Sequence, residues 1–308
     1  MMAMAGASAS GDQPGYPWPA TSGRSRPEWT GTGFLVDGRR VGVLAYHSAK
    51  SGWSEGLTSF HESVAGDDHP IDLLSRDWAS AALRRHLRNP RSTILEVGCS
   101  SGFMVRRLHA EWPSAVVMGS DFVSEPLERL AVSDSGIPLL QFDLLQCPLP
   151  DASVDATVLL NVLEHIRDDR GAVAQLVRIL KPGGVAVIEV PAGPHLYDAY
   201  DEYLQHERRY TARTLRALLE GCGLEVVEQS HLGFSVYPAF VRVKRRNQKL
   251  GASSVEARRR VVESSIQSTK SGSLLKWALR LEALAGRWVS YPTGIRTVAV
   301  ARRPEVAS

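Results

Sequence analysis

The chain has little that would tie it to a membrane span, a disulfide framework or nucleic acid. Its 308 residues include only three cysteines, which are scattered, so neither disulfides nor a Cys-x-x-Cys zinc site is expected. No apolar run approaches the roughly 18 residues that a membrane span needs. The formal net charge of +3 is too small to indicate a nucleic-acid partner. These absences predict a cytoplasmic protein with reduced thiols.

The composition is sufficient for a full α/β core, because 44% of the residues are apolar. Residues 1–27 are rich in Ala, Gly, Ser and Pro and lack the basic and apolar segments of a secretory signal, so a disordered tail is expected. Arginine greatly outnumbers lysine, which is typical of a GC-rich bacterial genome.

Apolar runs and amphipathic segments alternate regularly from residue 92 onward. Strands are expected at 93–97, 115–120, 138–142, 155–160, 184–190 and 224–229, and helices at 102–112, 124–133, 169–180 and 212–221. This alternation predicts a doubly wound parallel sheet with helices on both faces. A further strand is expected at 295–302, after a long interval.

The pattern divides the chain into five parts. They are a tail at 1–27, an N-terminal extension with a cap helix at 28–90, a nucleotide-binding core at 91–231, a basic and amphipathic helical insertion at 232–292, and a last strand with its tail at 293–308. The irregular stretch 28–68 either covers a pocket or docks as a simple extension.

The segment 94–104 joins a buried strand to a helix through two glycines. Gly98 and Gly102 allow a sharp turn, which exposes backbone N–H groups and a helix start at the carboxyl end of a strand. Glu96 precedes this turn, where its carboxylate would repel a pyrophosphate but attract an ammonium group. Asp121 ends the next strand and can accept hydrogen bonds from a ribose.

This segment resembles the motif E/D-x-G-x-G-x-G of class I S-adenosylmethionine (SAM)-dependent methyltransferases, with Ser100 in place of the middle glycine. Residues 155–165 resemble the D-x-x-x-x-x-x-V-L-E-H pattern of the same superfamily, and 191–211 resemble the P-A…D…H-x-R-R-Y-T segment of its small-molecule and quinone-biosynthesis group. The resemblance implies a Rossmann-like, seven-stranded, mostly parallel sheet with an antiparallel last strand. It also implies SAM as the cofactor and methyl transfer (EC 2.1.1.-).

The expected cofactor site lies at the carboxyl ends of the strands. Its residues are Glu96, Gly98, Ser100, Gly102, Asp121, Phe122, Asp143, Leu144 and Asn161. Asp121 would hold the ribose hydroxyls or cap the helix at 124–133. Asp143 would accept from the adenine amine, beside the Leu144 N–H, or stabilise a turn. Phe122 would pack on adenine or in the core, and Asn161 would line the methionine end.

Two histidines, His165 and His206, are candidates for the general base, because imidazole titrates near neutral pH. His165 could instead orient the following helix, or join Glu164 at a divalent metal, although no metal is expected. The acceptor-binding residues expected near the methyl donor are His195, Tyr197, Arg209 and Tyr210. The alternative for this wall is a salt-bridged helix entry capped by Thr211.

The insertion carries two features that bear on partners. Basic residues crowd 241–260, which suits membrane phosphates, a pyrophosphate-linked acceptor such as a lipid-linked saccharide, a nucleic acid or a solvated helix face. An apolar stripe at 274–288 suits the core, a homodimer contact or a helix lying on a membrane. A small-molecule acceptor is the expected partner. Nucleic acid is not, because an Asn/Asp-Pro-Pro-Tyr motif is absent after the fourth strand.

The favoured function is methylation of a hydroxyl on a secondary metabolite, a sugar or a lipid-linked saccharide. A non-catalytic SAM-fold scaffold is the first alternative. An NAD(P)-dependent oxidoreductase would need G-x-G-x-x-G, with a Tyr-x-x-x-Lys placed after the glycine turn. The one such spacing, Tyr46 to Lys50, precedes the turn and disfavours this class.

Overall fold

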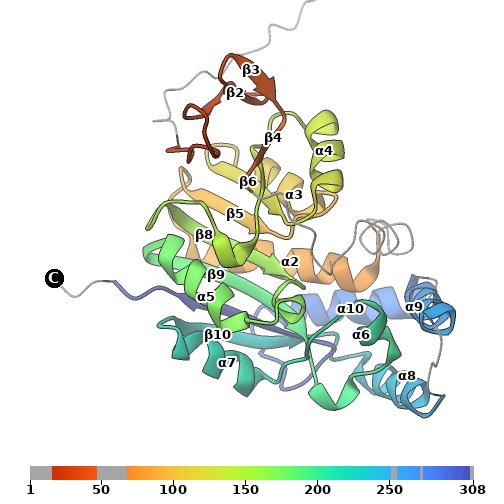
Figure 1. Ribbon diagram of the computed structural model, residues 1–308. Coiled ribbons are helices and arrows are strands. Elements are labelled where there is room, and N and C mark those ends of the chain that lie inside the picture. The colour runs from red at the N-terminus through yellow and green to blue at the C-terminus, as the bar shows by residue number, and fades with distance from the viewer. Residues whose placement is uncertain (1–15, 47–67, 251–254, 271–272, 306–308) are drawn as a thin grey trace, which may run out of the picture.

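The computed structural model describes residues 16–46, 68–250, 255–270 and 273–305 (Figure 1). Within these ranges the main sheet has eight strands in the order β10-β11-β9-β8-β5-β6-β7-β4. Neighbouring strands from β4 to β9 run parallel, whereas β11 is antiparallel to both β9 and β10. The doubly wound α/β fold with an antiparallel last strand is therefore confirmed.

The elements of the core follow the predicted alternation. The strands are β4 (Val43–Ala45), β5 (Thr93–Val97), β6 (Val116–Asp121), β7 (Leu139–Gln141), β8 (Val154–Leu160), β9 (Leu180–Pro191), β10 (Glu225–Leu232) and β11 (Arg296–Arg302). The helices are α3 (Phe103–Glu111), α4 (Ser124–Ser133), α5 (Asp169–Ile179), α6 (Ala199–Tyr203) and α7 (Ala212–Gly221), with the 3-10 turns η1 (Leu144–Gln146), η2 (Leu163–His165) and η3 (Pro194–Leu196). Thr211 caps α7 in a capping box with Thr214, as predicted.

Two apolar layers cover the sheet, one on each face. Leu95 on β5 packs with Leu176 of α5 and Leu215 of α7. Ile94, its neighbour in the strand, packs on the opposite face with Leu108 of α3. Successive strand residues point to opposite faces, and both faces are covered, so β5 is a continuous buried run.

The first described residues differ from the predicted tail. Tyr16 and Trp18 are buried, and the Trp18 ring meets Phe34 at a centroid distance of 4.9 Å. β1 (Glu28–Trp29), β2 (Phe34–Val36) and β3 (Arg39–Val41) form a small antiparallel sheet. A few aromatic residues thus anchor a segment whose Gly- and Pro-rich composition predicts disorder. The remainder of the predicted tail, 1–15, lies outside the described residues.

β4 is the eighth strand, which the sequence did not predict. It pairs in parallel with β7 at the edge of the sheet. Within the predicted extension, Val43–Ala45 therefore join the edge of the main sheet, whereas 47–67 lie outside the described residues. β9 also begins earlier than predicted, because Leu180 already pairs with Val154, ahead of an irregularity in the β8–β9 register.

Four further helices surround the sheet: α2 (Pro70–His86), α8 (Tyr237–Leu250), α9 (Val255–Lys270) and α10 (Ser273–Ala285). Figure 1 shows α10 beside α2, with α8 and α9 on the same side of the molecule as α6. The apolar stripe on α10 is not part of the core. Trp277 is 62% exposed and Leu281 is 60% exposed, because α10 packs on α2 through a different face that contains Leu279. None of the helices in the described ranges combines the length and the apolar character needed to cross a bilayer.

Candidate functional site

A cavity of about 720 Å³ opens at the carboxyl ends of the parallel strands. It lies at the switch point of the sheet, where the chain leaves β5 for β6 on one side and reaches β8 on the other. Its walls come from the turn after β5, the ends of β6, β7 and β8, and the helices α2, α6 and α8.

The glycine turn forms one wall of the cavity. Gly98 has φ +74°, and a Cβ there would come within 2.6 Å of Val162 Cγ2. Ser100 adopts the left-handed φ of +47°, so the middle position turns as a glycine would. Gly102 also has positive φ but does not line the cavity. Its missing Cβ leaves room for Leu130, which a Cβ would meet at 2.6 Å.

Three carboxylates face the cavity from successive strand ends. Asp121 accepts hydrogen bonds from the Ser100 N–H and the Val123 N–H, each at 2.9 Å. Asp143 accepts a hydrogen bond from the Leu145 N–H at 2.9 Å. This bond stabilises a turn, which is the alternative role predicted for Asp143. Because each carboxylate oxygen has two lone pairs, the bond to Leu145 leaves Asp143 able to accept further hydrogen bonds.

Glu96 is the third carboxylate and is only 4% exposed. Burial, together with the nearby charge of Asp121, raises the pKa of Glu96 well above its ordinary value. Its Oε2 atom has no hydrogen-bond partner among the described residues. A buried carboxylate oxygen without a hydrogen-bond partner favours a ligand that brings a hydrogen-bond donor or a positive charge.

A buried polar network supports the floor of the cavity. Arg296 on β11 donates to Glu189 Oε1 at 2.7 Å and also pairs with Asp72 on α2. Asn161, with φ +56°, donates from Nδ2 to the same Glu189 oxygen at 3.1 Å. Sequence reasoning missed Arg296 and Glu189. The sequence signal that could have identified Glu189 is that it is the single acid within the apolar run 185–190. A buried acid requires a partner.

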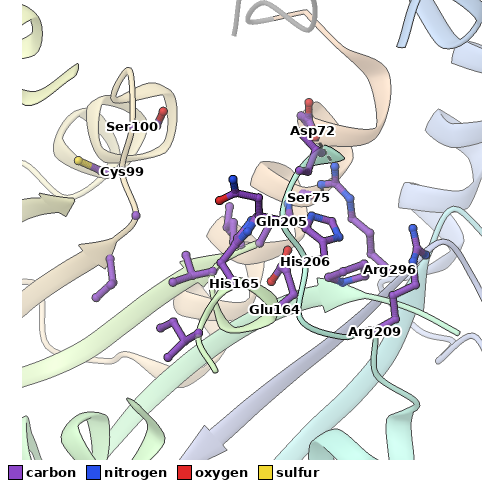
Figure 2. Close-up of a pocket in the computed structure, with 18 of the residues that line it drawn as sticks. Asp72, Ser75, Cys99, Ser100, Glu164, His165, Gln205, His206, Arg209 and Arg296 are labelled. Carbon is purple, nitrogen blue, oxygen red and sulfur yellow. Dashed lines mark hydrogen bonds and ion pairs between the residues drawn. The ribbon is translucent and has the colours of Figure 1, made fainter. Parts of the chain in front are cut away.

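His206 lines the cavity, as Figure 2 shows, and its ring is hydrogen-bonded to Asp201. The His206 Nδ1 to Asp201 Oδ1 distance is 2.8 Å. Burial alone would raise the pKa of Asp201. The hydrogen bond from His206 and the charges of Arg209 and Lys244 outweigh that effect and hold the pKa far below its usual range. Asp201 therefore remains ionised, and sequence reasoning missed it as the partner of His206.

Neutral His206 is favoured in this setting. Burial lowers its pKa below the ordinary 6.5, although the bond to Asp201 acts in the opposite direction. Because a carboxylate only accepts, Nδ1 carries the proton and Nε2 keeps a lone pair. The ring of His165, the other histidine candidate, lies beside it at a centroid distance of 4.7 Å. The structure thus brings the two predicted bases together.

Glu164 completes a cluster with these histidines (Figure 2). It is fully buried, and neither carboxylate oxygen has a hydrogen-bond partner in the part of the chain that the structure describes. Burial raises the pKa of Glu164 to about 8. Glu164, His165 and His206 offer ligand atoms that lie within 4.8 Å of one another, so this cluster could hold a divalent metal.

The Glu164→Gln variant is expected to change how stability depends on pH. In the folded protein Glu164 keeps its proton up to about pH 8, whereas the unfolded chain loses it near the ordinary pKa of 4.5. Rising pH therefore destabilises the wild type through this window, and the neutral amide removes that loss. The variant should gain about 3 kcal/mol relative to wild type between pH 5 and pH 8, measured by urea unfolding. Glu225→Gln, at an exposed carboxyl, serves as the control. A constant difference between Glu164→Gln and wild type would contradict the buried neutral carboxyl.

Three of the predicted acceptor residues do not line the cavity. His195 is exposed on η3, and the Tyr197 hydroxyl donates to the His206 carbonyl at 2.7 Å. The Tyr210 hydroxyl donates to Asp169 at 2.8 Å and so fixes the start of α5. The resemblance of 191–211 to a methyltransferase segment placed these residues in the acceptor wall. In the structure the hydroxyls of Tyr197 and Tyr210 bond to the surrounding protein instead.

The side of the cavity formed by α6 and α8 consists of residues outside the predicted acceptor set. Phe240 and Lys244 from α8 line it, together with Tyr200 from α6. Lys244 belongs to the basic stretch 241–260, yet it is buried and donates to Asp198 at 2.6 Å. Arg209 does line the cavity, but its guanidinium is already bound to Asp201 at 2.7 Å.

Comparison with known proteins identifies the domain. Residues 95–188 match the family model of the methyltransferase domain. The chain is 33% identical over 135 residues to a probable S-adenosylmethionine-dependent methyltransferase of Mycolicibacterium smegmatis, covering 43% of this chain and 52% of that protein. It is 30% identical over 141 residues to a demethylmenaquinone methyltransferase of Deinococcus radiodurans, covering 43% and 58%. The chain thus spans about half the length of the curated relatives it matches.

Solved structures agree on the fold. The SAM complex of Haemonchus contortus phosphoethanolamine N-methyltransferase 2 superposes with a TM-score of 0.51 at 16% identity, covering 83% of this chain and 59% of that one. A switch-point cavity with a glycine turn and acidic strand ends defines a nucleotide-binding α/β domain. The matches over residues 95–188 support the class I SAM-dependent methyltransferase superfamily for this domain, with SAM as its cofactor.

Proposed function

We propose that this protein transfers a methyl group from SAM to a hydroxyl of a small molecule. The observation that carries the proposal is the His206–Asp201 pair, which faces the same cavity as the glycine turn. When bound, SAM supplies an electrophilic methyl group on a sulfonium, so the protein has to align the acceptor and remove its proton. The relatives' own substrates differ, and the acceptor class is inferred from the site.

The proposed cofactor residues are those predicted at the strand ends that line the cavity. They are Glu96, Gly98, Ser100, Asp121, Phe122, Asp143, Leu144 and Asn161. The Oε2 atom of Glu96, which has no hydrogen-bond partner among the described residues, suits the ammonium group. The Asp121 carboxylate faces the cavity at the end of β6, a position that suits the ribose hydroxyls. Absence of a Cβ at Gly98 keeps the turn close to Val162, so the backbone can approach a ligand.

Replacing Asp121 by alanine should weaken binding of S-adenosylhomocysteine by about ten- to a hundred-fold. The variant loses charge-assisted hydrogen bonds, which contribute roughly 1.5–3 kcal/mol. Isothermal titration measures the change. Asp134→Ala is the matched control, because Asp134 pairs with Arg106 outside the cavity and should leave affinity unchanged. Equal affinity in Asp121→Ala and wild type would show that the ribose is held elsewhere.

His206 is the proposed general base. Its Nε2 lone pair takes the proton from the acceptor hydroxyl, and the ionised Asp201 stabilises the resulting imidazolium. The direct test is label transfer from methyl-labelled SAM to a panel of phenols, sugars and lipid-linked saccharides. Transfer to a hydroxyl supports the proposal. Tight SAM binding with no transfer to any acceptor would favour the scaffold alternative.

We also propose a cellular compartment and a contact surface for the protein. The three cysteines are free, which supports a reducing compartment such as the cytoplasm. The outward face of α10 is proposed as a contact surface, for which the sequence offered a homodimer or a membrane as the occupant.

A further inference from the structure

The helix α10 has three different faces around its axis: one packed, one apolar and exposed, and one basic. Leu279 and its neighbours pack on α2 beside Ile71, a residue that also lines the cavity. The opposite sector is apolar and exposed. It consists of Trp277 (62% exposed), Leu281 (60%), Leu284 (50%) and, in the turn that continues the helix, Trp288 (81%). These positions fall within one narrow stripe, because each is three or four residues from the next.

A basic flank runs along one side of this apolar stripe. Lys276, Arg280 and Arg287 are all exposed. At about 100° per residue, all three lie roughly 60–100° to the same side of the stripe. This arrangement puts long cationic side chains at the border of an exposed apolar band, where the stems can lie along the band and the charges extend past it.

Positive charge is also concentrated in the chain segment that contains α10. Residues 237–288 contain twelve Lys or Arg against three Asp or Glu, although the whole chain has a net charge of only +3. The rest of the chain is therefore net acidic. On α8, Arg242, Arg245, Arg246 and Lys249 are exposed. The positive charge is thus concentrated in the segment α8–α10, which also contains the exposed Trp277.

We infer that the outward face of α10 binds the surface of an anionic phospholipid membrane. Exposed Trp and Leu side chains enter the headgroup boundary of a bilayer, and flanking Lys and Arg side chains pair with lipid phosphates. A symmetric dimer would bring two copies of the same positive helices against each other. Anionic headgroups neutralise this charge, which makes lipid the better complement.

The experiment is flotation of the full chain with phosphatidylcholine vesicles that contain about 30% phosphatidylglycerol, compared with phosphatidylcholine alone. Wild type should float with the anionic vesicles, and high salt should release it. The double substitutions Trp277→Ala with Trp288→Ala, and Lys276→Glu with Arg280→Glu, should each weaken binding by about ten-fold or more. The charge-matched control, Arg88→Glu with Arg213→Glu, changes exposed residues elsewhere and should bind like wild type.

Two outcomes would overturn the inference. One is absence of wild type from the anionic vesicles. The other is a wild-type dimer in solution that the tryptophan double variant converts to a monomer, since α10 would then be the interface between copies. Unchanged S-adenosylhomocysteine binding shows that each variant is folded. Because flotation needs no methyl transfer, failure here leaves the proposed activity untouched.

Discussion

The His206→Ala variant is expected to lose about 10²–10⁴-fold in turnover while its affinity for S-adenosylhomocysteine stays close to wild type. A positioned general base contributes an effect of this size. Because Asp201 bonds to Nδ1 of His206, the lone pair on Nε2 is the one that can take a proton in the cavity. Turnover with labelled SAM and affinity by calorimetry separate the two effects. Wild-type turnover in the variant would show that His206 is not the base.

The pH profile gives a second readout of the same residue. Burial holds the pKa of His206 below 6.5, so wild-type turnover should be constant near neutral pH and fall as the imidazole gains a proton at lower pH. The residual activity of His206→Ala should lack this fall. His109→Ala, at an exposed position on α3, is the matched control and should keep both turnover and profile.

A chelator distinguishes the base from a metal ligand. If His206 acts as a base, treatment with EDTA leaves turnover unchanged. If turnover falls and a divalent ion restores it, the cluster of Glu164, His165 and His206 is a metal site instead. The His165→Ala variant is expected to lose less turnover than His206→Ala, because the Asp201 carboxylate orients His206.

Replacing Arg296 by methionine should destabilise the protein by about 3–5 kcal/mol. The change leaves Glu189 and Asp72 without the guanidinium that pairs with both, and the Glu189 side chain is fully buried. Urea unfolding measures the loss. Arg129→Met is the control, because it breaks an exposed pair with Glu125 and should cost less than about 1 kcal/mol.

A companion substitution separates loss of the ion pair from loss of packing. In Arg296→Met with Glu189→Gln, no buried charge is left at position 189, so part of the lost stability should return. If the double variant is as unstable as the single one, the destabilisation comes from packing. A cost for Arg296→Met as small as that of the exposed pair would contradict the buried network.

The local parts of the fold could be read from the sequence. The turn between Gly98 and Gly102 and the capping by Thr211 depend on residues that are neighbours in the chain. The edge strand β4 was missed because three residues carry no clear periodicity, and its partner β7 lies far along the chain. Burial of Trp18 likewise depends on Phe34, a contact that composition does not indicate.

In the site, too, local features could be predicted and contacts between distant residues could not. His165 and His206 were named as candidates because each lies in a recognisable local sequence pattern. The ion pair of Lys244 with Asp201 joins residues that are 43 positions apart, and only the folded chain brings α8 onto α6. The Tyr210 hydroxyl bonds to Asp169 rather than lining the cavity, because resemblance to a motif fixes a position along the chain but not the direction in which a side chain points.

The central claim is that the cavity at the switch point binds SAM, and calorimetric titration with S-adenosylhomocysteine tests it most directly. We expect saturable binding of about micromolar affinity, with no heat from NADH as the control ligand. Binding of NADH in place of S-adenosylhomocysteine, or binding of neither, would contradict the account.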